Sequence, residues 1–154
     1  MKEIITYPIL PIKGLTLFPG MLLHFDVAIP YGIDALKEGM ESDQLVVAVF
    51  QKGDEDDQIE QDHLEYIGVL AKIRQMVKLP KGNYRVLLEG LLRLELVGVD
   101  WNRHYYTGSF VELSRMPFQE TLENEALIRI AHDSVKDYAL SFPDFQKDAA
   151  DRIL

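Results

Sequence analysis

Residues 66–89 alternate between apolar and polar side chains around a four-residue turn, and this pattern restricts the folds open to the chain. Successive side chains of a strand point to opposite faces, so the first half of the pattern predicts an apolar face and a charged face. The apolar face would hold Ile67, Val69, Ala71, Ile73 and Val77. The charged face would hold Lys72, Arg74, Met76 and Lys78. The connecting Leu79-Pro80-Lys81-Gly82 fits a type I turn, so we expect a long antiparallel hairpin.

Further strands flank this hairpin. Three stretches rich in β-branched and aromatic residues predict strands, at residues 4–12, 22–29 and 105–113. The run 45–50 is continuously apolar and too short for a typical helix, which predicts a strand buried on both faces. The return strand 83–89 is followed by another at 91–99, and Gly90 between them indicates a bulge or bend. The chain should therefore hold six or seven strands.

Two parts of the chain have helical patterns instead. Residues 31–41 predict a short amphipathic helix. Residues 121–142 carry apolar side chains at helical spacing, with Thr121 as a plausible N-cap. Pro143 disfavours helical geometry in the residue before it, so this helix should end there and a second one should begin near Asp144.

The change from strand to helix patterning after Met116-Pro117 predicts two subdomains. The fold class is α+β, with a β subdomain at residues 1–116 and a helical subdomain at residues 117–154. The sequence stops at Leu154 inside a helical pattern without a C-cap signal. We therefore expect the helical region to continue in a longer protein, and a complete stand-alone protein is the alternative.

Four short phrases stand out in the first hundred residues. They are Pro8-Ile9-Leu10-Pro11-Ile12, Leu17-Phe18-Pro19-Gly20-Met21, the run from Ile73 to Gly82, and the run from Arg85 to Arg93. In this order and spacing they resemble the amino-terminal domain of the ATP-dependent Lon proteases. The resemblance is strongest over residues 7–30 and 66–93 and weaker after residue 105. It implies a small, twisted, PUA-like β-barrel of about six or seven strands with a short helix, followed by a helical subdomain.

The resemblance also implies a function. It predicts a non-catalytic substrate-recognition and assembly module of a hexameric, ATP-dependent serine protease that degrades misfolded and regulatory proteins. The partners would be unfolded or degron-bearing proteins and the other domains and subunits of the hexamer. A stand-alone PUA-like module for RNA or a small ligand is the alternative, although a net charge of −9 disfavours nucleic acid. A small enzyme that uses the acidic stretch 53–65 or His104 is a further alternative.

The residues themselves predict no catalytic, metal or cofactor site in this chain. There is no Gly-x-x-x-x-Gly-Lys-Ser/Thr phosphate loop, and the Ser–Lys dyad of the family has no counterpart. Zinc sites usually cluster their ligands, but the four histidines show no helical pairing. They are His24, His63, His104 and His132. We therefore expect no cofactor here, whereas the resemblance places ATP and Mg²⁺ in the parent protein.

Cellular location follows from composition. The chain has no cysteine, which fits a reducing compartment. It has no apolar run of 18 residues and no signal-peptide pattern. We expect a cytoplasmic protein without a membrane partner.

Candidate contact residues for unfolded chains come from unexpected apolar side chains. Met76 and Leu87 occupy positions that the hairpin's alternation gives to polar residues, and the alternative is that they pack under the helical part or the loop 13–20. Phe18 and Met21 flank the Pro19-Gly20 turn, where the alternative is a plug inside the barrel. Two cations of the same hairpin complete the set as contacts for acidic segments, namely Arg74 and Lys78.

Overall fold

The protein's structure, a computed structural model, describes residues 2–53 and 58–142. Its elements are β1 (Ile4–Ile12), β2 (Leu22–Val27), α1 (Pro30–Glu41), β3 (Leu45–Gln51), the 3₁₀ turn η1 (Gln61–His63), β4 (Leu64–Lys78), β5 (Tyr84–Asn102), β6 (Tyr105–Glu112) and α2 (Leu122–Ser141). They divide into two compact units, Met1–Ser114 and Arg115–Leu154. We call the first the β unit and describe each unit separately.

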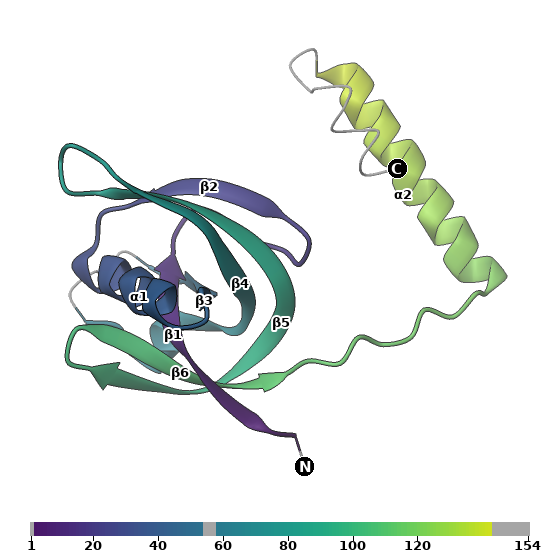
Figure 1. Cartoon of the computed structure of the whole chain (residues 1–154). Helices are drawn as coiled ribbons and strands as arrows, with labels where there is room; N and C mark the ends of the chain where they lie inside the picture. Colours follow the sequence, from purple (N-terminus) through teal and green to yellow (C-terminus); the bar gives the residue numbers. More distant parts are fainter. Residues whose placement is uncertain (1, 54–57, 143–154) are drawn as a thin grey trace. The chain divides into compact units, whose positions relative to one another are not determined.

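The strands of the β unit close on themselves (Figure 1). The sheet order is β2-β5-β4-β3-β1-β6, and β5 pairs with β6 as well, which joins five strands into a ring. β1 and β3 are parallel, and the segment that contains β2 and α1 connects them. All other pairings are antiparallel. β2 stands outside the ring, where it pairs with the first half of β5. This is the α+β barrel that the sequence predicted.

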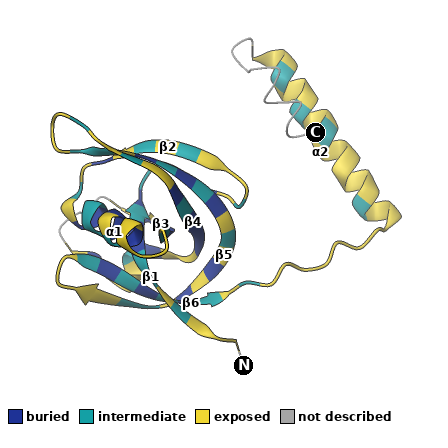
Figure 2. Ribbon diagram, in the orientation of Figure 1, coloured by how far each residue is buried: buried dark blue, intermediate teal, exposed yellow. Residues whose placement is uncertain are grey.

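Figure 2 shows buried residues alternating with more exposed ones along β5, whereas most of β3 is buried on both faces. In β3, Val46 and Ala48 contribute to one hydrophobic cluster, while Val47 and Val49 contribute to another. The continuous apolar run that predicted this strand is therefore explained, because both of its faces leave water. The first cluster also receives Leu17, Leu36, Val86 and Leu88, and the second receives Leu94, Leu96 and Phe110.

The long hairpin is present, but its faces differ from the simple alternation. The pairing of β4 with β5 shifts between Ile73 and Gln75, so Arg74 is an extra residue in the ladder. Such a bulge changes which residues of a strand point inward. Met76 therefore packs against the first cluster, and Val77 is exposed. The predicted positions of these two residues were wrong for that reason. Ile67 was also expected inside, but it lies opposite Glu95 and is half exposed.

Gly90 marks a second irregularity. Ala71 pairs with Gly90 and Leu70 pairs with Leu92, which leaves Leu91 as the extra residue. The bulge expected at this position is confirmed. The two strands expected on either side of it form one continuous strand, β5, because its hydrogen bonding to β4 resumes immediately after the bulge.

The helices begin and end near the predicted residues. α1 starts at Pro30, whose fixed φ suits the first helical position. In α2 the side chain of Thr121 accepts a hydrogen bond from the backbone N–H of Asn124 at 3.1 Å, which confirms the N-cap. None of the residues of α2 is buried. The second helix expected from Asp144 lies outside the described residues, as does part of the acidic stretch 53–65.

Candidate functional site

One surface of the β unit combines outward-facing residues of β2, β5 and β4. Val86 and Leu88 are fully buried, so the residues that alternate with them along β5 point away from the core. Residues paired across strands share a face, and this extends the surface to both neighbours of β5. We call this surface the outer face. It contains Leu22, His24 and Asp26 of β2, Arg85, Leu87, Glu89 and Leu91 of β5, and Lys72, Gln75 and Val77 of β4.

A loop at one end of the outer face is held by backbone contacts to Gly90. The N–H of Gly20 donates to the carbonyl of Gly90 at 2.8 Å, and the N–H of Gly90 donates to the carbonyl of Met21 at 2.9 Å. Gly20 has a φ of 81°, which glycine adopts without strain. The loop directs Leu17 into the first cluster, where it is buried. Its neighbour Phe18 is directed outward instead.

The exposed apolar residues of this region form what we call the apolar patch. Their exposed fractions are 60% for Phe18, 36% for Met21, 60% for Leu22 and 40% for Leu91. Leu87 is half-buried and lies between His24 of β2 and Gln75 of β4. The apolar patch comprises these five residues. Sequence reasoning found Phe18, Met21 and Leu87. It missed Leu22 and Leu91, whose only signal was their position beside Met21 and Gly90.

Met76 does not belong to this patch. The bulge at Arg74 turns its side chain toward the first cluster, where it is partly buried. The place of Met76 is therefore against the core of the β unit and not on the charged face.

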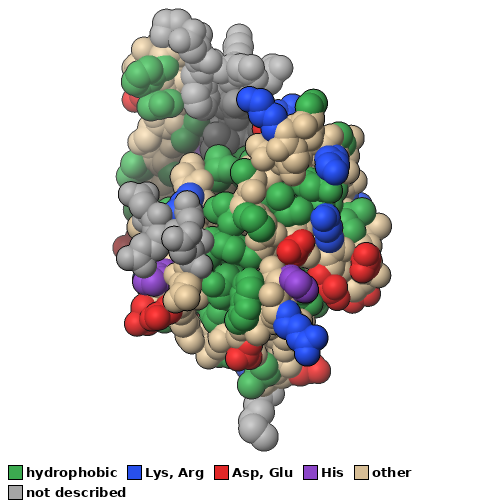
Figure 3. All heavy atoms as spheres, turned by 90° about the vertical axis from the view of Figure 1, so that its left-hand side faces the viewer, with side chains coloured by type: hydrophobic (Ala, Val, Ile, Leu, Met, Phe, Trp, Pro, Cys, Tyr) green, Lys and Arg blue, Asp and Glu red, His purple; other side chains and the backbone are tan. Residues whose placement is uncertain are grey.

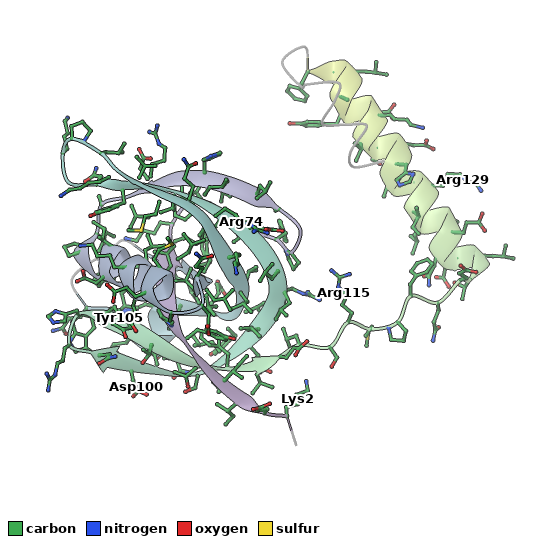
Figure 4. The ribbon with its side chains drawn as sticks, in the orientation of Figure 1. Lys2, Arg74, Asp100, Tyr105, Arg115 and Arg129 are labelled. Atoms are coloured by element: carbon green, nitrogen blue, oxygen red, sulfur yellow. The ribbon has the colours of Figure 1, made fainter. Side chains whose placement is uncertain are left out.

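Two ion pairs cross the outer face. Arg74, labelled in Figure 4, donates a hydrogen bond to the Glu89 carboxylate. Arg85 reaches Asp26 with two bonds, at 2.7 Å from Nε and 3.0 Å from Nη2. These hydrogen bonds lower the pKa of the Asp26 carboxyl below its ordinary value and raise the pKa of Arg85. Both ion pairs lie beside apolar residues of the outer face, and within each pair the two charges are matched.

Lys78 is the last residue of β4, at the hairpin that Figure 1 draws on the left, and Figure 3 turns that side toward the viewer. A hollow there is lined by Lys78 and Lys81 from the hairpin and by Lys37 from α1. The Lys37 ammonium lies 5.5 Å from the centre of the Tyr84 ring. Figure 3 also shows apolar side chains gathered along the middle of this end. The two predicted cations, Arg74 and Lys78, therefore do not share one site.

Within residues 2–53 and 58–142, no three His, Asp or Glu side chains are arranged to hold a metal ion. His104 lies beside Trp101 and Arg103 at an open hollow near the start of α1. Trp101 packs on Tyr106 with ring centres 4.8 Å apart. Neither helix of the described chain has the length and apolar character of a membrane span.

Comparisons with known proteins agree with this architecture. The model of the ATP-dependent protease La (LON) substrate-binding domain matches residues 6–153. Lon protease 1 of Bacillus subtilis (strain 168) is 36% identical over 132 residues, which cover 85% of this chain and 17% of that protein. The chain therefore spans less than a fifth of the length of this curated relative.

Two solved structures share the fold. The amino-terminal domain of a Mycobacterium avium complex Lon protease matches with a TM-score of 0.56 at 17% identity, over 90% of this chain and 76% of that chain. A Lon N-terminal domain protein from Xanthomonas campestris matches with a TM-score of 0.62 at 13% identity, over 84% and 72%. The ring of strands, the helix after it and the match along nearly the whole sequence lead to one conclusion: this chain belongs to the family of Lon substrate-binding domains.

Proposed function

We propose that this chain is the substrate-recognition module of an ATP-dependent Lon-type serine protease and that it binds unfolded segments of proteins through the apolar patch. The observation that carries the proposal is the exposure of Phe18, Met21 and Leu22 on a well-packed β unit. Contiguous exposed apolar surface on a soluble protein marks an interaction site. Unfolded chains offer the apolar side chains that such a patch buries.

The composition of the patch fits many partners rather than one. Met21 has a flexible, polarisable side chain, which adapts to differently shaped apolar groups. The ion pairs Arg74–Glu89 and Arg85–Asp26 border the patch without a large excess of either charge. Acidic segments of a substrate would find their contacts at Lys78 and its neighbours instead.

Catalysis would belong to other parts of the parent protein. The chain contains no phosphate-binding loop, so ATP and Mg²⁺ would be held outside it. Its further partners would be those other domains and the neighbouring subunits of a hexamer. The lack of cysteine supports a cytoplasmic location.

The test is a fluorescence titration of the 154-residue chain against a permanently unfolded labelled protein and its folded form. We expect binding to the unfolded form alone. Leu87→Asp should weaken it by roughly tenfold, which corresponds to about 1.4 kcal/mol. Val97→Asp is the matched control, because Val97 is exposed on the same strand but lies outside the patch. Equal affinities of the two variants for the unfolded protein would show that the patch is not the binding site. If the wild-type chain does not bind the unfolded protein, the proposed function is wrong.

A further inference from the structure

β2 is a strand with one unpaired edge. Its only strand partner among the described residues is β5, from Leu22 opposite Glu89 to Val27 opposite Tyr84. Figure 1 shows β2 along the margin of the sheet, outside the ring of five strands. An edge strand presents a row of backbone N–H and C=O groups on which another strand can form.

The pairing identifies which backbone groups face this edge. Because Gly90 donates to Met21 at 2.9 Å, the alternation of antiparallel bonding directs Leu23, Phe25 and Val27 toward β5. The N–H and C=O groups of the intervening Leu22, His24 and Asp26 then point to the open edge. Within the described part of the chain, no backbone hydrogen bond joins those three residues to a segment other than β5.

A cavity of about 230 Å³ lies at the end of this edge. One wall is Phe25 and Val27 of β2, and the other is formed by residues that follow β1, including Leu15. Gln51 of β3 also lines it, and only 2% of Gln51 is exposed. Lys13 and Asp26 are the charged residues of its lining, and most of the remaining residues are apolar.

We propose that the open edge of β2 binds an extended polypeptide segment as an added strand, and that the cavity receives one apolar side chain of that segment. This inference rests on the proposed function and specifies how the unfolded substrate is held. A strand added beside β2 shares its pleat, so alternate side chains point to the same face as Phe25 and Val27. That face opens into the cavity. Backbone bonds would give sequence-independent affinity, and the cavity would select the apolar position.

The segment that binds the open edge of β2 belongs to an unfolded chain, because strand addition requires an extended backbone whose hydrogen-bonding groups are unpaired. β2 spans six residues, which corresponds to about 20 Å of strand. A folded protein seldom offers such a segment, since its strands are already paired or protected. Leu22 of the apolar patch lies at the start of the same strand, so a bound segment runs from the patch toward the cavity.

The edge is tested with His24→Pro in the full chain. Proline removes the N–H that faces the open edge and leaves the bonds to β5 intact, which edge strands tolerate. We expect the affinity for the unfolded labelled protein to fall roughly tenfold. We expect the same loss for an unstructured ten-residue peptide that alternates leucine and serine. His24→Ala retains the backbone donor and should bind within about twofold of wild type.

Two further measurements leave the protein unchanged. Methylating alternate backbone nitrogens of the peptide removes the donors that an added strand would use, so its binding should be lost. Amide hydrogen exchange at Leu22, His24 and Asp26 should slow when the unmodified peptide binds.

The possible results separate the two proposals. Undiminished binding by His24→Pro and by the methylated peptide overturns strand addition, although the substrate-recognition function stands. No binding of the unfolded protein or the peptide to wild type overturns both. If His24→Pro does not fold, the methylated peptide and the exchange rates decide the outcome.

Discussion

At the scale of single residues, Gly90 occupies a position where another segment leaves no room for a side chain. A Cβ at this residue would lie 2.2 Å from the carbonyl oxygen of Phe18, which belongs to the backbone and cannot rotate away. We predict that Gly90→Ala lowers the free energy of unfolding by roughly 1–3 kcal/mol, as overpacking does. Urea denaturation measures the change. Gly98→Ala, whose Cβ would meet its nearest neighbour at 3.8 Å, should stay within about 0.5 kcal/mol.

The carboxylate of Asp26 makes the stability of the β unit depend on pH. Its pKa is lowered by the hydrogen bonds from Arg85, so the ionised form is favoured in the folded state. The resulting stabilisation is present above the ordinary pKa of 3.8 and is lost as pH falls through the folded pKa. We predict that wild type exceeds Asp26→Asn in unfolding free energy at about pH 6, and that the difference disappears near pH 2. In an Arg85→Gln background, the change in unfolding free energy caused by Asp26→Asn should depend little on pH.

At the scale of elements, the bulge at Arg74 separates two residues that the sequence pattern placed together. Met76 packs against the first cluster, whereas Leu87 lies on the outer face. We predict that Met76→Asp lowers the free energy of unfolding by roughly 2–3 kcal/mol, because it brings a charge against an apolar core. Leu87→Asp should cost about 1 kcal/mol or less. Similar losses for both variants in urea denaturation would contradict the inward orientation of Met76.

The first turn of α2 depends on its cap. Thr121 accepts from Asn124, and Glu123 and Glu125 complement the positive end of the helix dipole. We predict that Thr121→Ala destabilises this turn by about 1 kcal/mol and speeds amide exchange at Asn124 about fivefold. Thr121→Ser retains the acceptor and should exchange nearly as wild type does. Unchanged exchange in Thr121→Ala would mean that the cap contributes nothing measurable.

At the scale of the whole molecule, a net charge of −9 distinguishes the function hypotheses. Binding through the apolar patch and a strand edge involves few released counterions. We predict that the affinity for unfolded protein changes less than about threefold between 50 and 200 mM salt. Binding to a phosphate backbone would fall by roughly 10³–10⁵ over this range. A loss of affinity of that size would favour RNA as the partner, and the family comparisons give no support to that alternative.

Local patterns predicted most elements of the molecule, and the errors arose where segments distant in sequence meet. The apolar run of β3 and the N-cap of α2 depend on neighbouring residues, so the sequence was sufficient for both. The orientation of Met76 depends on the register of β4 against β5, which alternation alone does not contain. The same holds for the site, since Leu22 and Leu91 become neighbours of Leu87 only through strand pairing.

The pairing of the first strand with the last has a consequence for biosynthesis. Ile4 of β1 lies opposite Val111 of β6, so the ring closes only after almost all of the β unit has left the ribosome. Until then the nascent chain carries β1 without one of its two neighbours. Long-range strand pairing of this kind folds in milliseconds to seconds rather than microseconds. A ribosome-bound chain that stops before β6 should therefore remain sensitive to protease, whereas one that extends past Glu112 and clears the exit tunnel should become resistant.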